Sequence, residues 1–529
     1  MADSSNAGVH TRRSLSAVEQ IESTSSLHAS ANDVGSHGGT GTGTGSTTSS
    51  STKFQPLEME SADDATLDNN GAENDEELIH PLVHHGSDDE GGGGLSGDSP
   101  SKKSHHHHHH HRTSTVTDDG HGSAPPGSAT TPQVIINIVI SFVGAGLLGI
   151  PNAFSQAGWL LGSVTLLCVS ALNVYAMLCL PVVQTALQAQ HPHETIQSYG
   201  DLGRVILGDR GEKAIFVCLG ISQAGFATAY LIFIAANLNS IYDVSRGVVC
   251  VACIPGLTLL VQFRDLKSLS PFSLLANTAN FCALSAVLFQ DYESYTPHND
   301  TIHKVKWGGL LYVIAITIYS MEGVGLILSL KASCKQPSSF SHLLITTLTM
   351  ISLFMVVFGS AGYWAFGDAT LAPITLNMSS HWSATFVKCA LCLGLYLTYP
   401  IMMFPIWTIC ENAHPIFNSS SGGGGSSGNN AYNKYRIAMR ASMVVISAIV
   451  AYGVPNFGKF LSLVGSSICT LLGFVFPMYF HLYVMGKELP LWQKCLDGGL
   501  LVGGFSFGVM GTWQSLVAML EGELEGEVR

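Results

Sequence analysis

The sequence predicts an all-α polytopic membrane protein with about 11 transmembrane helices and a disordered N-terminal tail. Composition is the first indication: of 529 residues, 46% are hydrophobic and only 12% are charged, whereas soluble chains have about a quarter charged residues. The second is distribution, because polar residues gather before about residue 130 and the rest is apolar with short polar breaks. The third is the presence of glycine and proline inside two apolar segments, which predicts interrupted helices.

The segment 1–130 is predicted to be a disordered cytosolic tail, acidic and rich in histidine. It contains low-complexity stretches such as GGTGTGTGSTTSSST, and it lacks the apolar periodicity that a packed core requires. The uninterrupted run from His105 to His111 is a candidate for loose binding of a transition metal, although a solvated polar tract is the favoured interpretation. The last residues, 520–529, are predicted to be an acidic C-terminal tail.

The segment 131–519 is predicted to be the transmembrane domain. A helix needs about 20 apolar residues to cross a bilayer, and the sequence offers 11 candidates, of which the fourth is short. They are 134–155, 158–183, 214–237, 247–263, 270–290, 308–330, 341–366, 384–408, 437–455, 459–485 and 496–519.

Lysine and arginine in the connections predict the orientation, because cytosolic loops carry an excess of both. With the N-terminal tail in the cytosol, 12 of these residues fall in cytosolic connections and 5 on the opposite side. We therefore expect a cytosolic N-terminus and, with an odd number of spans, a C-terminus on the other side.

Two spans are predicted to be broken. The first contains VGAGLLGIP, and the sixth contains IYSMEGVGLIL. Inside lipid an unpaired backbone group costs several kcal/mol, so helices break only where protein or a water-filled cavity receives the freed groups. Broken helices five spans apart are typical of an inverted repeat of five helices. Close helix packing is the alternative role for these glycines, but two breaks at matching positions favour a binding site.

The paired breaks predict the chemistry of the ligand. Free N–H groups at half-helix N-termini suit a carboxylate, and free carbonyl groups suit an ammonium group or a cation. An amino acid carries both charges, so we expect one between the breaks. Glu322 lies inside the sixth span, and buried carboxyl groups in membranes mark ion or proton paths. It is the proton-coupling candidate; the alternative is that it only accepts N–H bonds at the break.

Five stretches resemble the amino acid/auxin permease family. They are SFVGAGLLGIPNAFSQAGWLLG, YSMEGVGLILSL, GYWAFGDATL, LTYPIMMFPIW and VPNFGKFLSLVGSSICTLLGFVFP. The chain is most similar to the vacuolar neutral amino acid transporters of plants and fungi, and the resemblance covers about 132–519. It implies 11 spans, a LeuT-like inverted repeat and proton coupling.

The resemblance also implies substrate-binding residues in the first span. The break at Gly144, Ala145 and Gly146 is expected to contact the substrate, with Ser141 on the turn before it. Ile140 stands where sodium-coupled members of the family often carry asparagine. This departure disfavours sodium as the coupling ion.

Further residues follow from the resemblance in the sixth and eighth spans. Glu322 and Gly323 match an acidic–glycine step of the family. Tyr399 and Pro400 match a Tyr-Pro step, so Tyr399 is expected to face the substrate or a coupling-ion position.

Together these observations predict a secondary active transporter, proton-coupled, that moves neutral amino acids across a vacuolar or other endomembrane by alternating access. Gln223 and Tyr230 of the third span are polar candidates for lining the cavity, and His481 of the tenth is a second titratable candidate that we interpret as structural. Protonation at or near Glu322 would shift the balance between the two access states. We expect neutral amino acids, protons and the lipid bilayer as partners, with no cofactor, no nucleic acid and no required oligomer.

Other classes of protein fit the sequence less well. A channel would need a ring of repeated filter residues, and a receptor would not need paired broken helices. A metal-ion transporter with a His-rich cytosolic tail would need pairs of ligands in several spans, and no metal site is expected here. A membrane-bound enzyme would show a nucleophile–base motif or a cofactor fingerprint. A plasma-membrane amino acid importer stays open beside the vacuolar alternative.

Overall fold

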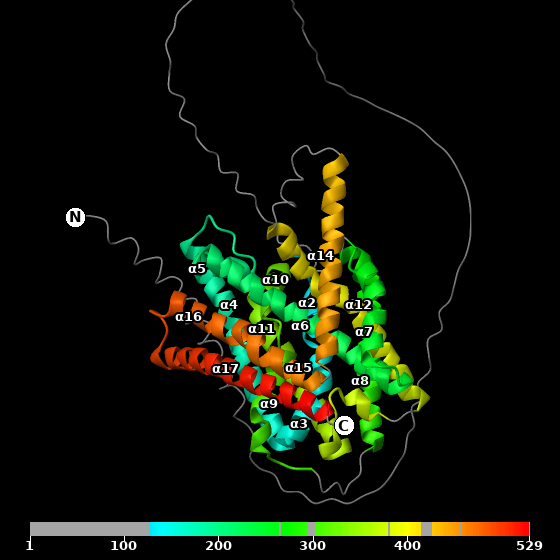
Figure 1. Cartoon of the computed structure of the whole chain (residues 1–529). Helices are drawn as coiled ribbons and strands as arrows, with labels where there is room; N and C mark the ends of the chain where they lie inside the picture. The colour runs from blue at the N-terminus through cyan, green and yellow to red at the C-terminus, as the bar shows by residue number, and fades with distance from the viewer. Residues whose placement is uncertain are drawn as a thin grey trace, which may run out of the picture. The chain divides into compact units, whose positions relative to one another are not determined.

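The computed structural model describes residues 127–263, 266–294, 302–378, 381–413, 426–454 and 456–527 (Figure 1). The predicted tail, including the histidine run, lies outside these residues except for 127–130. All the predicted spans coincide with helices. The unbroken ones, together with the short connecting helix α5, are α4 (Trp159–Gln190), α5 (Tyr199–Leu207), α6 (Asp209–Tyr242), α7 (Arg246–Leu260), α8 (Leu266–Ser294), α11 (Phe340–Phe366), α12 (Trp382–Ala413), α14 (Ser426–Gly453) and α17 (Leu491–Glu527).

Three spans are assembled from shorter pieces. The first is α2 (Thr131–Phe142), η1 (Ala145–Gly149) and α3 (Ile150–Ala157). The sixth is η2 (Trp307–Gly309), α9 (Leu310–Ser320), η3 (Val324–Leu326) and α10 (Ile327–Ser333). The tenth is α15 (Phe457–Val464), the π-helical segments η8 (Gly465–Cys469) and η9 (Leu471–Val475), and α16 (Phe476–Met485). The remaining short helices are η4 (Pro337–Ser339), η5 (Gly367–Ala369) and η6 (Ile374–Asn377).

Length, hydropathy and exposure identify a multi-pass membrane protein. Among the described residues, 8 helices are long and apolar enough to cross a bilayer, and the bent pair α2 and η1–α3 makes a ninth. The two remaining predicted spans coincide with α7, which has 15 residues, and α8, which has 29. On α17 the side chains of Val502, Phe505, Val509 and Trp513 are 59–68% exposed, an apolar face that fits lipid.

The first span breaks where the sequence predicts. α2 begins with Pro132 in its first turn, and the Thr130 N–H donates to Gln133 Oε1 at 2.9 Å. The helix ends at Phe142, and Gly144 is extended, with φ −126° and ψ −163°. The chain then re-enters the helix through η1, and the two halves differ in direction by 45°.

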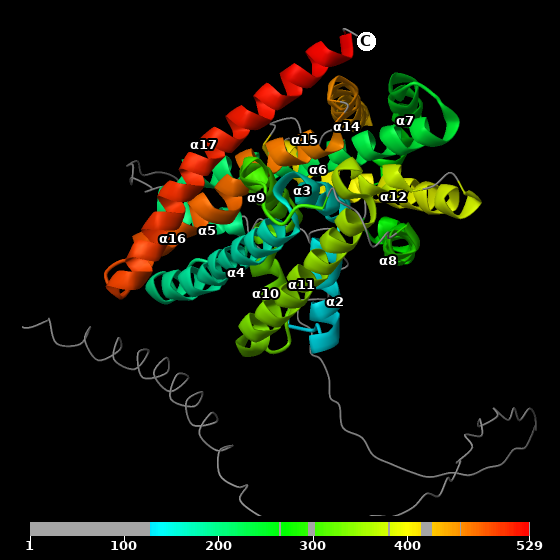
Figure 2. The same cartoon turned by 90° about the horizontal axis from the view of Figure 1, so that it is seen from below.

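The sixth span also breaks where the sequence predicts. α9 ends at Ser320, and the next helical residue is Val324 at the start of η3. The two broken spans lie against each other in the middle of the membrane domain, where Figure 2 shows α3 beside α9. Since five crossings separate them, they run in opposite directions, which is the relation that a 5+5 inverted repeat requires.

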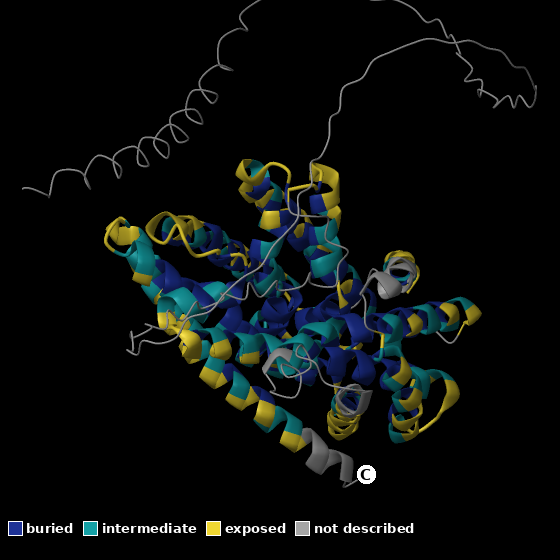
Figure 3. Cartoon of the chain, turned by 90° about the horizontal axis from the view of Figure 1, so that it is seen from above, coloured by how far each residue is buried: buried dark blue, intermediate teal, exposed yellow. Residues whose placement is uncertain are grey.

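The most buried residues also lie in the middle of the membrane domain, around the two broken spans. Figure 3 shows the buried segments gathered in the middle of the membrane domain, while exposed residues occupy helix ends and outward faces. Gly465 of η8 packs so closely on α9 that a Cβ there would lie 2.1 Å from the carbonyl oxygen of Ala315. The broken spans are therefore held in a tight protein environment, as freed backbone groups in a membrane require.

The two broken spans are connected by backbone hydrogen bonds at the end of the domain where α2 begins. The Gly127 N–H donates to the Ala332 carbonyl, and the Ala129 N–H donates to the Ser333 carbonyl, both at 3.0 Å. The Lys335 N–H returns a bond to the Ala129 carbonyl at 3.0 Å. Residues 127–130, predicted as the end of the tail, thus pair with the end of α10. At the other terminus α17 continues as helix to Glu527, through most of the predicted C-terminal tail.

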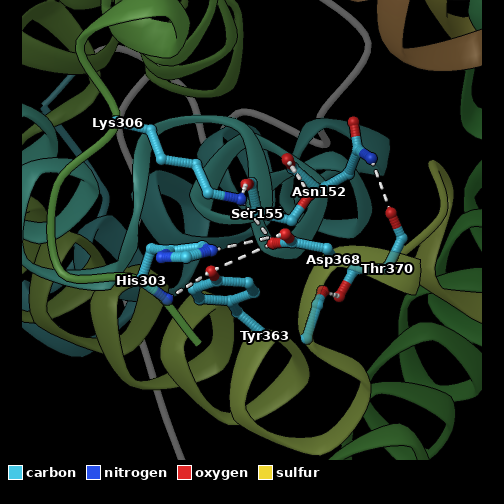
Figure 4. Close-up of polar contacts among 8 residues, drawn as sticks. Asn152, Ser155, His303, Lys306, Tyr363, Asp368 and Thr370 are labelled. Atoms are coloured by element: carbon cyan, nitrogen blue, oxygen red, sulfur yellow. Dashed lines mark hydrogen bonds and ion pairs between the residues drawn. The ribbon is translucent and has the colours of Figure 1, made fainter. Parts of the chain in front are cut away.

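At the opposite end of the two broken spans, side chains make the connecting hydrogen bonds and the ion pair. Figure 4 shows Lys306, from the segment before η2, reaching Asp368 in η5. The Lys306 ammonium also donates to the Ser155 carbonyl of α3 at 3.1 Å. Asn152, on the same helix, donates to the Thr370 carbonyl at 2.7 Å. Charged and amide groups therefore fix α3 at this end.

Candidate functional site

A cavity of about 130 Å³ lies between the two helix breaks. Four parts of the fold supply its wall: both broken spans, α6 and α12. The lining residues are Ser141, Phe142, Gly144, Ala145, Gly146, Leu219, Gln223, Phe226, Tyr230, Tyr319, Ser320, Glu322, Gly323, Gly325, Leu326, Ile401, Met402 and Pro405.

The structure brings nearly all the sequence-predicted site residues to this cavity. The predicted residues in its wall are Ser141, Gly144, Ala145, Gly146, Gln223, Tyr230, Glu322 and Gly323. Tyr399 stands apart from them: it is buried on α12, and its hydroxyl pairs with the hydroxyl of Ser447 on α14. Ile401 and Met402, just beyond it, supply the α12 side of the wall.

Glycine is required where the two breaks meet. A Cβ on Gly146 would lie 2.6 Å from Ser320 Oγ and 3.0 Å from Ser320 Cα. A Cβ on Gly323 would lie 2.4 Å from Cζ of Phe142. Gly144 differs, because a Cβ there has nothing within 4 Å. The close approach of the two spans at this point therefore depends on Gly146, whereas Gly323 leaves room for the ring of Phe142.

Glu322 occupies the sixth break with one carboxyl oxygen unpartnered. The backbone amide of Val324 hydrogen-bonds to its carboxyl group, so the expected contact with the break is present. Oε2, however, is enclosed and has no hydrogen-bond partner among the described residues. An acceptor enclosed without a donor is costly, and a proton on the carboxyl group would turn this oxygen into a donor.

Asn173 of α4 provides a second acceptor in the same enclosure. Its Nδ2 donates to the Met321 carbonyl at 3.4 Å, but its buried Oδ1 has no partner within the described structure. A Cβ on Gly473 of η9 would lie 3.8 Å from Glu322 Oε2 and 3.9 Å from Asn173 Oδ1. Two unpartnered acceptors thus face the Gly473 backbone, an arrangement that suits a protonated carboxyl group.

The rest of the wall is apolar or uncharged. Among the lining residues, Glu322 alone carries a charged side chain. The rings of Phe226 and Tyr319 meet edge to face, with centroids 4.9 Å apart. Ser320 contributes a buried hydroxyl oxygen that no described residue contacts by a hydrogen bond. The cavity therefore offers polar groups near the breaks and apolar surface around them.

Several lining residues were missed by the sequence reasoning. Leu219 and Phe226 lie on the same face of α6 as Gln223 and Tyr230, because they are three or four residues apart. Helical periodicity could have found them. Ser320 immediately precedes the break, but no property of the sequence separates it from the other serines in the spans.

His481 has a buried partner that the sequence did not reveal. Its Nδ1 lies 2.8 Å from Asp497 Oδ2, and the hydroxyl of Tyr175 donates to Asp497 Oδ1 at 2.6 Å. Asp497 is second in the predicted eleventh span, where an acidic residue looks like the polar end of a helix. In the structure it is 0% exposed.

In the described part of the chain, no group of three or more His, Cys, Asp or Glu residues is arranged to hold a metal ion. The histidine run, His105 to His111, lies outside that part. The residues around the cavity are the candidate site that the structure supports, and they combine polar groups with apolar surface.

A membrane domain whose first and sixth helices break around a shared cavity has the architecture of a secondary transporter. Residues 127–517 match the family described as transmembrane amino acid transporter protein. The chain belongs to this family, the amino acid/auxin permeases, and is an amino acid transporter.

Individual relatives agree with the family. The chain is 34% identical over 398 residues to amino acid transporter ANT1 of Arabidopsis thaliana, covering 73% of this chain and 92% of the relative. It is 27% identical over 372 residues to vacuolar amino acid transporter 3 of Saccharomyces cerevisiae, covering 67% of this chain and 51% of that protein.

Among solved structures, a Na⁺-coupled sialic acid symporter superposes with a TM-score of 0.45 at 12% identity, covering 75% of this chain and 89% of that one.

Proposed function

We propose that this protein moves neutral amino acids across a vacuolar or related endomembrane, driven by protons, with its N-terminus in the cytosol. The observation that carries the proposal is the cavity between two glycine-lined helix breaks, with one carboxyl group, Glu322, in its wall. The yeast relative is named as a vacuolar transporter, which supports the choice of membrane. The excess of Lys and Arg on the N-terminal side supports the orientation.

The substrate backbone binds across the two breaks. η1 begins at Ala145, so its first N–H groups lack partners within the helix and attract the substrate carboxylate. α9 ends at Ser320, and its last carbonyl groups, with the hydroxyl of Ser320, suit the ammonium group. The zwitterion thereby replaces hydrogen bonds that the broken helices have lost.

The wall selects for neutral side chains. A lysine or glutamate side chain would bring an additional charge against Leu219, Phe226 and Met402, and Glu322, the one charged side chain among the lining residues, is taken by the coupling proton. Burying an unpaired charge costs several kcal/mol. Neutral side chains instead gain from contact with this apolar surface.

Glu322 couples the proton to the substrate. In its ionised form the carboxyl group leaves Oε2 unpartnered beside Asn173, so this state is disfavoured when the site is closed. Protonation removes the charge and lets the two halves of the repeat rock as neutral units. An acidic lumen would load Glu322, and release of the proton would accompany delivery of the amino acid to the cytosol.

The test is transport by the purified full-length chain in proteoliposomes. We expect uptake of labelled alanine and leucine to rise when a proton gradient is imposed and to persist without sodium, while lysine and glutamate are carried at least about tenfold more slowly. Wild-type uptake that ignores the gradient would remove the coupling claim. Lysine or glutamate uptake as fast as that of leucine would remove the claim of neutral substrates. A fluorescent fusion in cells tests the membrane, and labelling at the plasma membrane alone would contradict it.

A further inference from the structure

A second buried acid lies away from the cavity, in the hairpin formed by the last two spans. Asp497 of α17 accepts a hydrogen bond from the Tyr175 hydroxyl of α4 and contacts the His481 imidazole of α16. The histidine and aspartate side chains are 6% and 0% exposed. Figure 1 shows α16 and α17 side by side, which is the packing that places this triad between three spans.

The triad lies along the same two elements as the Glu322 cluster. On α4, Asn173 faces Met321, and Tyr175, two residues further along, faces Asp497. On the tenth span, Gly473 lies beside Glu322, and His481 follows eight residues later. A helical rise of 1.5 Å per residue puts the two clusters roughly 12 Å apart along this span. His481 is the one nearer the loop that joins α16 to α17.

Tyr199 of α5 bridges the interval between the clusters. Its hydroxyl donates to the Leu472 carbonyl at 3.0 Å, next to Gly473. Its ring meets Phe480, the residue before His481, edge to face at 6.0 Å. The loop between α16 and α17 is on the same side of the membrane as the N-terminus, because ten crossings separate them. The triad therefore lies between Glu322 and that side.

Charge dictates how the pair of His481 and Asp497 behaves. With a neutral imidazole the buried pair carries a charge of −1, which is expensive inside a membrane domain. Binding one proton gives imidazolium beside carboxylate, a net charge of zero and a charge-assisted hydrogen bond from Nδ1–H to Oδ2. Release of the proton reverses this step. The pair thus holds one exchangeable proton.

We propose that His481 and Asp497, tuned by Tyr175, form a second proton-binding site through which the coupling proton exchanges with the N-terminal side of the membrane. The proposal rests on the proton coupling proposed above. A proton that leaves the Glu322 carboxyl group leaves it ionised, and the pair of His481 and Asp497 takes up one proton before passing it on. Among other titratable groups, Cys179 of α4 interacts electrostatically with Asp497, and Tyr199 of α5 contacts Phe480 beside His481. Along the chain, Tyr479 and Tyr483 of α16 and Lys494 and Cys495 of α17 lie within three residues of the pair.

A purely mechanical role is the alternative, in which the triad only fastens the last hairpin to α4. The double variant His481→Gln/Asp497→Asn separates the two roles. Its amide groups retain a neutral hydrogen bond between α16 and α17, but they cannot bind a proton in this pH range. A fastening role survives this change, whereas a proton site does not.

The experiment compares gradient-driven leucine uptake with leucine counterflow, which requires no net proton movement, from pH 5 to 8. For the double variant we expect counterflow within about twofold of wild type and gradient-driven uptake at least about tenfold lower, with its pH dependence flattened. A pH profile and a ratio of the two rates that both match wild type would overturn the proposal. A parallel loss of both rates, with the ratio unchanged, would also overturn it in favour of fastening.

Tyr175→Phe gives a second readout if the double variant does not fold. It removes the phenol that donates to the Asp497 carboxylate but leaves the pair in place, so the pH dependence of gradient-driven uptake should change while counterflow stays within about twofold of wild type. An unchanged pH dependence would contradict the proposal. Failure of proton coupling itself is distinguishable, because wild-type uptake would then ignore the gradient before any variant is compared.

Discussion

The two helix breaks use similar residues, but different neighbours constrain them. In the first span, Gly146 faces the Cα and hydroxyl of Ser320, and its backbone approaches fixed backbone of the partner span. In the sixth span, Gly323 faces the ring of Phe142, a side chain that can rotate. The first break is therefore a rigid contact that sets the width of the cavity. The sixth break, which also carries Glu322, is covered by a movable ring, and we propose that a change of access is most easily accommodated there.

The largest effect should come from Gly146→Ala. The added methyl group would lie within 3 Å of Ser320 Oγ and the Tyr319 ring, and 3.0 Å from Ser320 Cα, so a backbone must shift. We expect a loss of about 1–3 kcal/mol in the free energy of unfolding and loss of transport, measured by thermal unfolding in detergent and by leucine counterflow.

Gly144→Ala is the matched control, since a Cβ at that position has nothing within 4 Å. Gly144 also lines the cavity, so the thermal midpoint should stay near wild type while the KM for leucine rises. Equal thermal losses for the two variants would contradict the rigid contact at Gly146.

Gly323→Ala should have an intermediate effect. The methyl group would meet three ring atoms of Phe142 at 2.4–2.9 Å, but the ring can move away. We expect a loss of about 1 kcal/mol or less in stability and a clear fall in counterflow. Phe142→Leu in the same chain should restore part of the rate, because it frees the space. The absence of rescue would show that Gly323 acts through backbone conformation and not through the ring.

Gly325→Ala should have the smallest effect of the series. Its nearest neighbour would be the terminal Cδ2 of Leu219 at 2.8 Å, the far end of a flexible side chain. Alanine also favours helix by up to about 1 kcal/mol relative to glycine, so stability should be unchanged or slightly higher. A loss of stability as large as that of Gly146→Ala would mean that the space around a glycine at the breaks does not determine whether alanine is tolerated there.

The sequence predicts the broken spans and the cavity residues near them because clustered glycine and proline weaken a helix, and a membrane tolerates a break only where protein or water receives the freed groups. It places Tyr399 by family resemblance alone, and no physical signal separates a tyrosine facing substrate from one paired with Ser447 across two helices. Asp497 was overlooked because hydropathy assigns acidic residues near span ends to water. Only the packing of α17 against α16 and the hydrogen bond from Tyr175 of α4 show that it is buried.

The Asn173 enclosure could not be anticipated either. Its formation depends on the π-helical segments η8 and η9, which bring Gly473 beside Glu322. In the sequence, Gly473 is one of two glycines in the predicted span 459–485. π-Helical segments have no reliable signature in the local sequence, although they frequently occur at functional sites.

Proton dependence of transport in Glu322→Gln tests the central claim most directly. Glutamine preserves shape and hydrogen bonding but binds no proton in the working range of pH. Leucine counterflow and gradient-driven leucine uptake are measured side by side in proteoliposomes of wild type and variant. We predict that the variant retains counterflow and loses the response of uptake to the proton gradient. A variant whose uptake follows the gradient as wild type does would contradict the assignment of Glu322 as the coupling residue.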